Sequence, residues 1–159
     1  MTKKFLNKLK TEGKLEIINP SEEISLSYSY KSSNCFKSAK ILLQNNLYDN
    51  SVSMSYYAMY NQLTALLFNV GIKCENHTGS IMLLKELFEK ENLFNIISNA
   101  KKERIDKDYY VTTEKNGITK EIAQELLIGA EKFIIETKII INQLNYSGVQ
   151  NIRQKFDEI

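Results

Sequence analysis

Residues Tyr48–Gly71 read YDNSVSMSYYAMYNQLTALLFNVG, and the spacing of their apolar side chains predicts one long α-helix. These side chains recur in steps of three and four, which places a single stripe of a helix against a core. The stripe consists of Val52, Tyr56, Met59, Leu63, Leu66 and Val70. Gly71 follows the last of them, where a left-handed C-terminal cap favours glycine. We therefore expect the helix to end there and to form part of the core.

A second face of the same helix carries small or short side chains. It consists of Ser51, Ser55, Ala58, Gln62 and Ala65. Another helix can approach such a face closely. We expect Ser51, Ser55, Ala58 and Gln62 to form the contact between two copies of the chain in a homodimer.

The composition sets limits on the architecture and on the binding partners. A chain of 159 residues is long enough for one domain with a core. Hydrophobic residues make up 43% of it and charged residues 25%, as in soluble globular proteins, and a single proline permits long helices. Because the net charge is only +2, any binding of nucleic acid must depend on a local basic patch.

The cysteines and the single histidine argue against a bound metal. Cys35 and Cys74 lack metal-ligand spacing, and His77 alone leaves too few ligands for zinc. We expect no metal and no cofactor. The first residues contain no hydrophobic signal segment, so we expect a cytoplasmic protein with reduced thiols. The apolar stretch 126–144 carries four charges in its middle, each costing roughly 2.5–3.5 kcal/mol in a bilayer, and is expected to be a core helix.

The remaining segments also have the pattern of helices. Ser21, followed by two acidic residues, marks the start of a helix that runs to about Gln44 and forms an antiparallel hairpin with the helix from Tyr48. The later helices are expected over Ser80–Lys90, over Leu93–Ile105, and from a Thr119 cap to about Leu144.

No segment alternates for long enough to build a sheet. The sequence therefore predicts an all-α fold, an antiparallel helical bundle of four to five main helices in a single domain spanning 1–159. Residues 1–18 are expected to form a basic arm or short helix that could track a phosphate backbone, and residues 145–159 a mobile tail or a terminal helix. The lysines of the arm are Lys3, Lys4, Lys8, Lys10 and Lys14.

The run from Ser53 to Phe88, SMSYYAMYNQLTALLFNVGIKCENHTGSIMLLKELF, resembles a subgroup of HEPN (higher eukaryotes and prokaryotes nucleotide-binding) domains. The pattern of that subgroup reads S-R-x-Y-Y-A-M-F-H-A-x-x-A-L-L, then a glycine and a lysine-T-H-S-G loop. The segment from Arg104 to Tyr109 is similar to its R-x-x-x-D-Y segment. The resemblance covers most of the chain from Lys31 to Leu144.

This resemblance implies a helical bundle that commonly dimerises. It also implies a role as a toxin or defence effector, often beside a small nucleotidyltransferase partner. The catalytic members are metal-independent ribonucleases with an Arg-x4–6-His motif, whose arginine and histidine positions fall on Met54 and Asn61 here. A methionine cannot bind a phosphate as arginine does, and an asparagine cannot exchange a proton near neutral pH. The departure weakens the implied nuclease activity.

A candidate ligand site follows from the helix geometry and the resemblance. Asn50, Met54, Tyr57 and Asn61 share one helix face, whereas Tyr56 and Tyr60 lie on the apolar stripe and are expected to pack in the core. The residues expected to contact RNA or a nucleotide are Tyr57, Asn61, Lys73, His77 and Arg104.

The role of Arg104 has two interpretations. It can pair with Asp108 as an internal anchor, or it can supply the cation that Met54 lacks, with Lys101 and Lys102 enlarging the patch.

Three functions remain open at this stage. The first is a binding module with a degenerate nuclease motif that engages RNA or a partner protein. The second is a ribonuclease with a divergent site, in which His77 is the base and Arg104 the phosphate contact. The third is a nucleotide-binding accessory subunit of a nucleotidyltransferase, with a pocket lined by Tyr57, Asn61 and His77.

Overall fold

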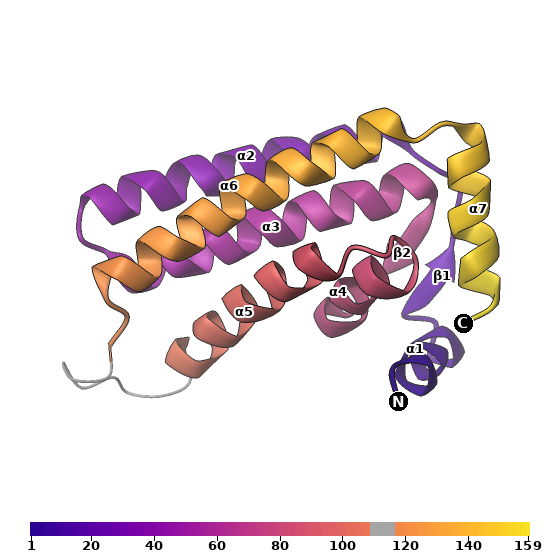
Figure 1. Ribbon diagram of the computed structural model, residues 1–159, viewed down its shortest axis with the longest axis horizontal. Helices are drawn as coiled ribbons and strands as arrows, with labels where there is room; N and C mark the ends of the chain where they lie inside the picture. The colour runs from indigo at the N-terminus through magenta and orange to yellow at the C-terminus, as the bar shows by residue number, and fades with distance from the viewer. Residues whose placement is uncertain (109–116) are drawn as a thin grey trace.

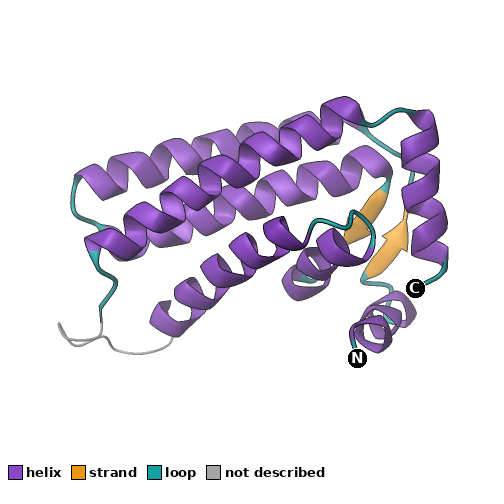
Figure 2. Cartoon of the chain, viewed as in Figure 1, coloured by secondary structure: helices purple, strands orange, loops and turns teal. Residues whose placement is uncertain are grey.

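The computed structural model describes the backbone of residues 1–108 and 117–159, and the side chains of residues 1–104 and 117–159. The described residues form an all-α bundle, as the sequence predicts, with one small sheet added to it (Figure 2). The elements in chain order are α1 (Thr2–Thr11), β1 (Leu15–Ile17), α2 (Glu22–Gln44), α3 (Tyr48–Val70), β2 (Ile72–Cys74), α4 (His77–Glu86), α5 (Glu91–Asp108), α6 (Lys120–Gln143) and α7 (Tyr146–Asp157).

Helix α3 is the centre of the bundle, with α2, α6 and α5 packed around it (Figure 1). Its apolar stripe is completely buried, as predicted, from Val52 to Val70. Gly71 ends the helix with φ of 76°, the left-handed cap that its position in the sequence indicates. The predicted Thr119 cap of α6 is present, since Thr119 Oγ1 accepts a hydrogen bond from the Ile122 amide. Helix α2 begins where predicted, and Ser21 Oγ caps it by accepting a hydrogen bond from the Ile24 amide.

The small face of α3 packs inside the chain, so the prediction that it forms a dimer contact is wrong. Ser51, Ser55, Ala58 and Gln62 are all fully buried. The covering element is α2, whose own small residues lie one every seven along the helix: Ser25, Ser32 and Ala39.

Serine hydroxyls hold these two helices together. Ser32 Oγ donates to the Ala58 carbonyl at 2.7 Å, and Ser51 Oγ donates to the Ala39 carbonyl at 2.8 Å. A third hydroxyl, that of Ser25, donates to the carbonyl of Ala65 at 2.8 Å. Such short side chains reach a carbonyl on the neighbouring helix only when the two backbones lie close, and the contact is therefore built into the monomer.

The sheet is a feature that the sequence pattern does not indicate. Strand β1 pairs antiparallel with β2, with Leu15 opposite Cys74 and Ile17 opposite Ile72. Each strand has only three residues, which is too short for alternation to be recognised. The pairing ties the N-terminal segment to the chain that leaves the end of α3.

Both terminal segments are ordered into helices that gather at one end of the bundle (Figure 1). Helix α1 buries Leu6 and Leu9, and α7 buries Ile152 and Phe156. Arg153 of α7 donates from Nη1 to three backbone carbonyls, those of Ile18, Val70 and Gly71, at 2.8, 3.0 and 3.0 Å. The last helix thus fastens the segment after β1 to the C-terminal end of α3.

Helix α6 carries exposed apolar residues on its outer face, Ile128, Ile135 and Ile139, with charged residues between them. In the part of the chain that the structure describes, no helix has both the length and the apolar character needed to cross a membrane.

A cationic and aromatic site beside helix α3

His77 is the first residue of α4, three residues earlier than the sequence pattern suggests. Asn76 is the N-cap, and its side-chain oxygen accepts a hydrogen bond from the Gly79 amide at 2.8 Å. Strand β2 ends two residues before this cap, so the sheet and the cap together fix where His77 emerges. The expected loop histidine is therefore held at the start of a helix.

Two tyrosines of α3 hold the His77 ring. The Tyr56 hydroxyl and His77 Nδ1 are 2.8 Å apart, and the Tyr60 ring is stacked on the imidazole with centroids 3.7 Å apart. Burial raises the pKa of the Tyr56 phenol, which therefore keeps its proton and can donate it to Nδ1. In that arrangement Nε2 carries the ring proton. Tyr56 is fully buried, as predicted, and it also orients the histidine.

Arg104 of α5 lies against Tyr56 and against a third tyrosine of α3, Tyr57. Its Cζ lies 4.8 Å from the ring centroid of Tyr57 and 5.3 Å from that of Tyr56, both within the range of a cation–π contact. One turn earlier, Lys101 Nζ donates to Thr78 Oγ1 of α4 at 2.5 Å. Arg104 and Lys101 therefore flank His77 with two positive charges. We call Tyr57, His77, Lys101 and Arg104 the cationic site.

The charges of this site shift the pKa values of its own residues. Burial, followed by the charges of Arg104 and Lys101, lowers the pKa of His77 below its ordinary 6.5. Burial and the charge of Arg104 also lower the pKa of Lys101. His77 is accordingly neutral at pH 7. A bound anion would relieve the repulsion among these groups, which is the electrostatic condition of a phosphate site.

The two motif positions, Met54 and Asn61, lie three residues before and four residues after Tyr57 on α3. Met54 lines an open pocket of about 500 Å³ with Ser38, Ile41 and Leu42 of α2. Asn61 Nδ2 donates to the Tyr57 carbonyl at 2.8 Å and lies 3.7 Å from the Cys35 sulfur. One position is thus apolar, and the amide of the other makes contacts within the chain.

Of the residues expected to bind a ligand, Tyr57, His77 and Arg104 lie together, whereas the structure does not place Lys73 with them. Its ammonium group forms ion pairs with Glu75 at 2.7 Å and with Glu16 at 3.4 Å, and these hydrogen bonds raise its pKa. The interpretation of Arg104 as an anchor for Asp108 depends on a side chain outside the described residues.

Sequence reasoning assigned Tyr60 and Thr78 no part in the site. The spacing of Tyr56 and Tyr60 by four residues was the available signal, since it puts both rings on one side of α3. Among the described residues, no three His, Cys, Asp or Glu side chains are grouped so that they could hold a metal ion.

Comparison with known proteins gives one family. The model of the HEPN domain matches residues 27–140. A candidate toxin of Methanocaldococcus jannaschii is 31% identical over 111 residues, covering 67% of this chain and 80% of that protein. A second candidate toxin of the same organism is 32% identical over 130 residues, covering 79% and 86%. A UPF0332 protein of Archaeoglobus fulgidus is 29% identical over 117 residues, covering 71% and 91%.

Proposed function

The chain belongs to the HEPN domain family, and from that premise we propose that it is an RNA-binding module whose phosphate contacts come from the cationic site. The main support for this proposal is the position of Arg104. Its guanidinium lies against Tyr57, on the α3 face that also holds Met54 and Asn61. This arginine supplies a positive charge beside the family's motif face, where Met54 supplies none. A guanidinium offers a planar set of donors that suits phosphate oxygens.

The aromatic residues around that charge favour a single strand as the ligand. Tyr57 is only partly buried and can present its ring edge or face to a base, a contact worth roughly 1–3 kcal/mol in single-strand binders. Lys101 adds a second cation one turn away. Cations for the backbone and an aromatic surface for the bases are the two parts of sequence-tolerant recognition of single-stranded RNA.

The biological setting is part of the same proposal. Two of the relatives carry toxin in their names, which supports a toxin–antitoxin or defence role for this chain. We further propose that the chain forms a homodimer and acts with a nucleotidyltransferase-type partner, as the family resemblance implies. Because the small face of α3 is internal, a dimer must use another surface. Light scattering at tens of micromolar tests this point, and a monomer there rejects the homodimer.

RNA binding is tested with the substitution Arg104→Gln. We expect affinity for a fluorescent single-stranded RNA to fall by roughly 1–3 kcal/mol, about 5- to 150-fold, and its salt dependence to become shallower. Lys102→Gln is the matched control, since Lys102 is an exposed neighbour on α5. If Arg104→Gln lowers the melting temperature but leaves affinity and salt slope unchanged, Arg104 is structural and the proposed site is wrong. A mononucleotide that binds as tightly as the RNA favours the accessory-subunit function.

A second function, RNA cleavage at a divergent site, is favoured by a separate observation. His77 is neutral at pH 7 and lies beside two cations, which is the state that a general base requires. Cleavage of mixed RNA that persists in a chelator and is lost in His77→Gln would establish it. Cleavage that is unaffected by this substitution would come from a contaminating nuclease or another site.

A further inference from the structure

Two open pockets share Met82 of α4 in their lining. The first lies between α1 and α4, has a volume of about 680 Å³, and is lined by Thr2, Lys4, Phe5 and Lys8 in addition to Met1 and Met82. The second lies between α4 and α5, has a volume of about 220 Å³, and is lined by Ile81, Phe94 and Ser98 in addition to Thr78, Met82 and Lys101. We call the two together the α1–α5 groove. Figure 1 shows α5, α4 and α1 following one another along the lower edge of the molecule.

The second pocket of the groove shares Lys101 with the cationic site. Lys101 and Thr78 line this pocket, and they are also the pair whose hydrogen bond connects α5 to α4. Thr78 follows His77 directly, and Arg104 lies one helical turn beyond Lys101. A strand bound at Arg104 would therefore reach the groove by way of Lys101 and Thr78.

The lining has the chemistry of a single-strand track. The charged side chains among the lining residues are those of Lys4, Lys8 and Lys101, and Phe5 and Phe94 provide aromatic rings. Lysine stems and methionine form the apolar walls, while the ammonium groups can reach the rim. Phosphates at the rim and bases over an apolar floor would use both properties.

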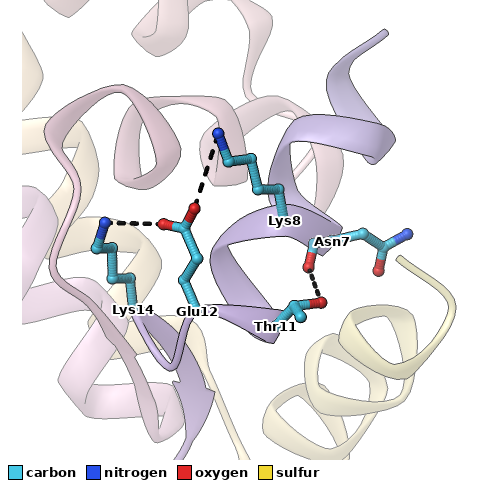
Figure 3. Close-up of polar contacts among 5 residues, drawn as sticks. All are labelled: Asn7, Lys8, Thr11, Glu12 and Lys14. Atoms are coloured by element: carbon cyan, nitrogen blue, oxygen red, sulfur yellow. Dashed lines mark hydrogen bonds and ion pairs between the residues drawn. The ribbon is translucent and has the colours of Figure 1, made fainter.

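The acidic residue Glu12 pairs with one lysine of this lining. Lys8 forms an ion pair with Glu12 at 3.7 Å, and Glu12 also binds Lys14 at 2.8 Å (Figure 3). The Lys8 side chain is 70% exposed, and a pair as exposed as this contributes little and is easily exchanged for a phosphate. Lys10 differs, because its ammonium donates to the Phe156 carbonyl at 2.6 Å and helps to dock α1 on α7.

We propose that single-stranded RNA bound at the cationic site continues through the α1–α5 groove to Lys4 and Lys8. The proposal rests on the proposed RNA-binding function and extends it to a part of the chain that the HEPN model does not match, since the match begins at residue 27. It assigns the basic N-terminal helix a role in binding longer strands, whereas the cationic site alone serves short ones.

The experiment compares RNA length with a charge-removing variant. Binding of a 4-nucleotide and a 16-nucleotide single-stranded RNA is measured by fluorescence anisotropy, lengths that bracket the site sizes of about 4–16 nucleotides known for single-strand binders. The variant is Lys4→Gln/Lys8→Gln. The matched control is Lys132→Gln/Lys138→Gln, which removes the same charge from two exposed positions on α6.

We expect the groove variant to weaken binding of the 16-nucleotide RNA at least about tenfold and to make its salt slope shallower by about 1.4, or 0.7 for each lost phosphate contact. Binding of the 4-nucleotide RNA should stay unchanged, and the α6 control should leave both RNAs unchanged. Two outcomes overturn the proposed role of the groove while leaving that of the cationic site intact. One is that both variants weaken binding of the 16-nucleotide RNA equally, and the other is that the wild-type protein binds both RNA lengths with equal affinity. Failure of both RNAs to bind removes the proposed function and the groove together. An acidic peptide that binds the groove with no length-dependent RNA binding would identify a protein partner and overturn the RNA track.

Discussion

Replacing Arg153 by alanine should destabilise the protein through the end of α3. The substitution removes three hydrogen bonds from one guanidinium nitrogen, to the carbonyls of Ile18, Val70 and Gly71. The Gly71 carbonyl keeps the amide of Ile18 as a donor at 2.9 Å, so the loss falls mainly on the carbonyls of Ile18 and Val70. Bonds from a charged donor contribute roughly 1.5–3 kcal/mol, and water can partly replace them at this half-buried position. We therefore expect a loss of about 2–3 kcal/mol.

Calorimetry is the assay for this prediction. In a chain of this length each kcal/mol shifts the melting temperature by about 2–4 °C, so the expected decrease is roughly 4–12 °C. Gln154→Ala, at the exposed neighbouring residue, is the control. A decrease no larger than that of the control would refute the reasoning, because Arg153 would then contribute nothing that water cannot supply. Since β2 leads directly to Asn76 and His77, the variant should also weaken RNA binding.

Three further predictions concern single residues. Nuclear magnetic resonance of His77, the only histidine, should give a pKa below 6.5 that rises in Arg104→Gln. The free energy of unfolding should fall as the pH drops below about 6.5, because the unfolded chain then binds the proton more readily than the folded one. A free energy of unfolding that does not change with pH in this range contradicts the prediction. Gly71→Ala should cost at least about 2 kcal/mol in urea unfolding, since φ is 76° and the new methyl would lie 2.5 Å from the Ile18 carbonyl. Gln62→Leu should leave the free energy of unfolding unchanged or raise it by about 1–2 kcal/mol, because the buried amide has no hydrogen-bond partner among the described residues. A clear loss of stability would show that the amide is bonded to water.

Local signals in the sequence were sufficient to predict where most of the helices begin or end. Ser21, Thr119 and Gly71 mark helix ends through bonds or dihedral angles that depend only on nearby residues, and all three are present. Asn76 carried an equally local signal that would have placed the start of α4 at His77. The strands were missed because Leu15 and Cys74 lie far apart in the chain, and three-residue strands depend on the partner.

The sequence named three residues that the structure brings together, but it did not indicate their arrangement. Tyr57, His77 and Arg104 were identified from the pattern, but nothing local to α3 shows that α5 brings Arg104 over Tyr57. The small face shows the same limit. Periodicity identified Ser51 and Ala58 as part of a contact surface but did not say what contacts it. Only the matching stripe of small residues on α2 indicates that the partner is α2 and not a second copy of the chain.

The hydroxyl contacts between α2 and α3 also restrict how the sequences of relatives in this family can vary. Each joins a side chain on one helix to a carbonyl on the other, pairing position 25 with 65, 32 with 58, and 39 with 51. A bulkier residue at any of these sites would separate the two backbones and break the neighbouring bonds as well. Substitutions at the paired positions should therefore covary among relatives, and the separation of the two helices should be inherited as a unit even where the ligand-binding residues diverge.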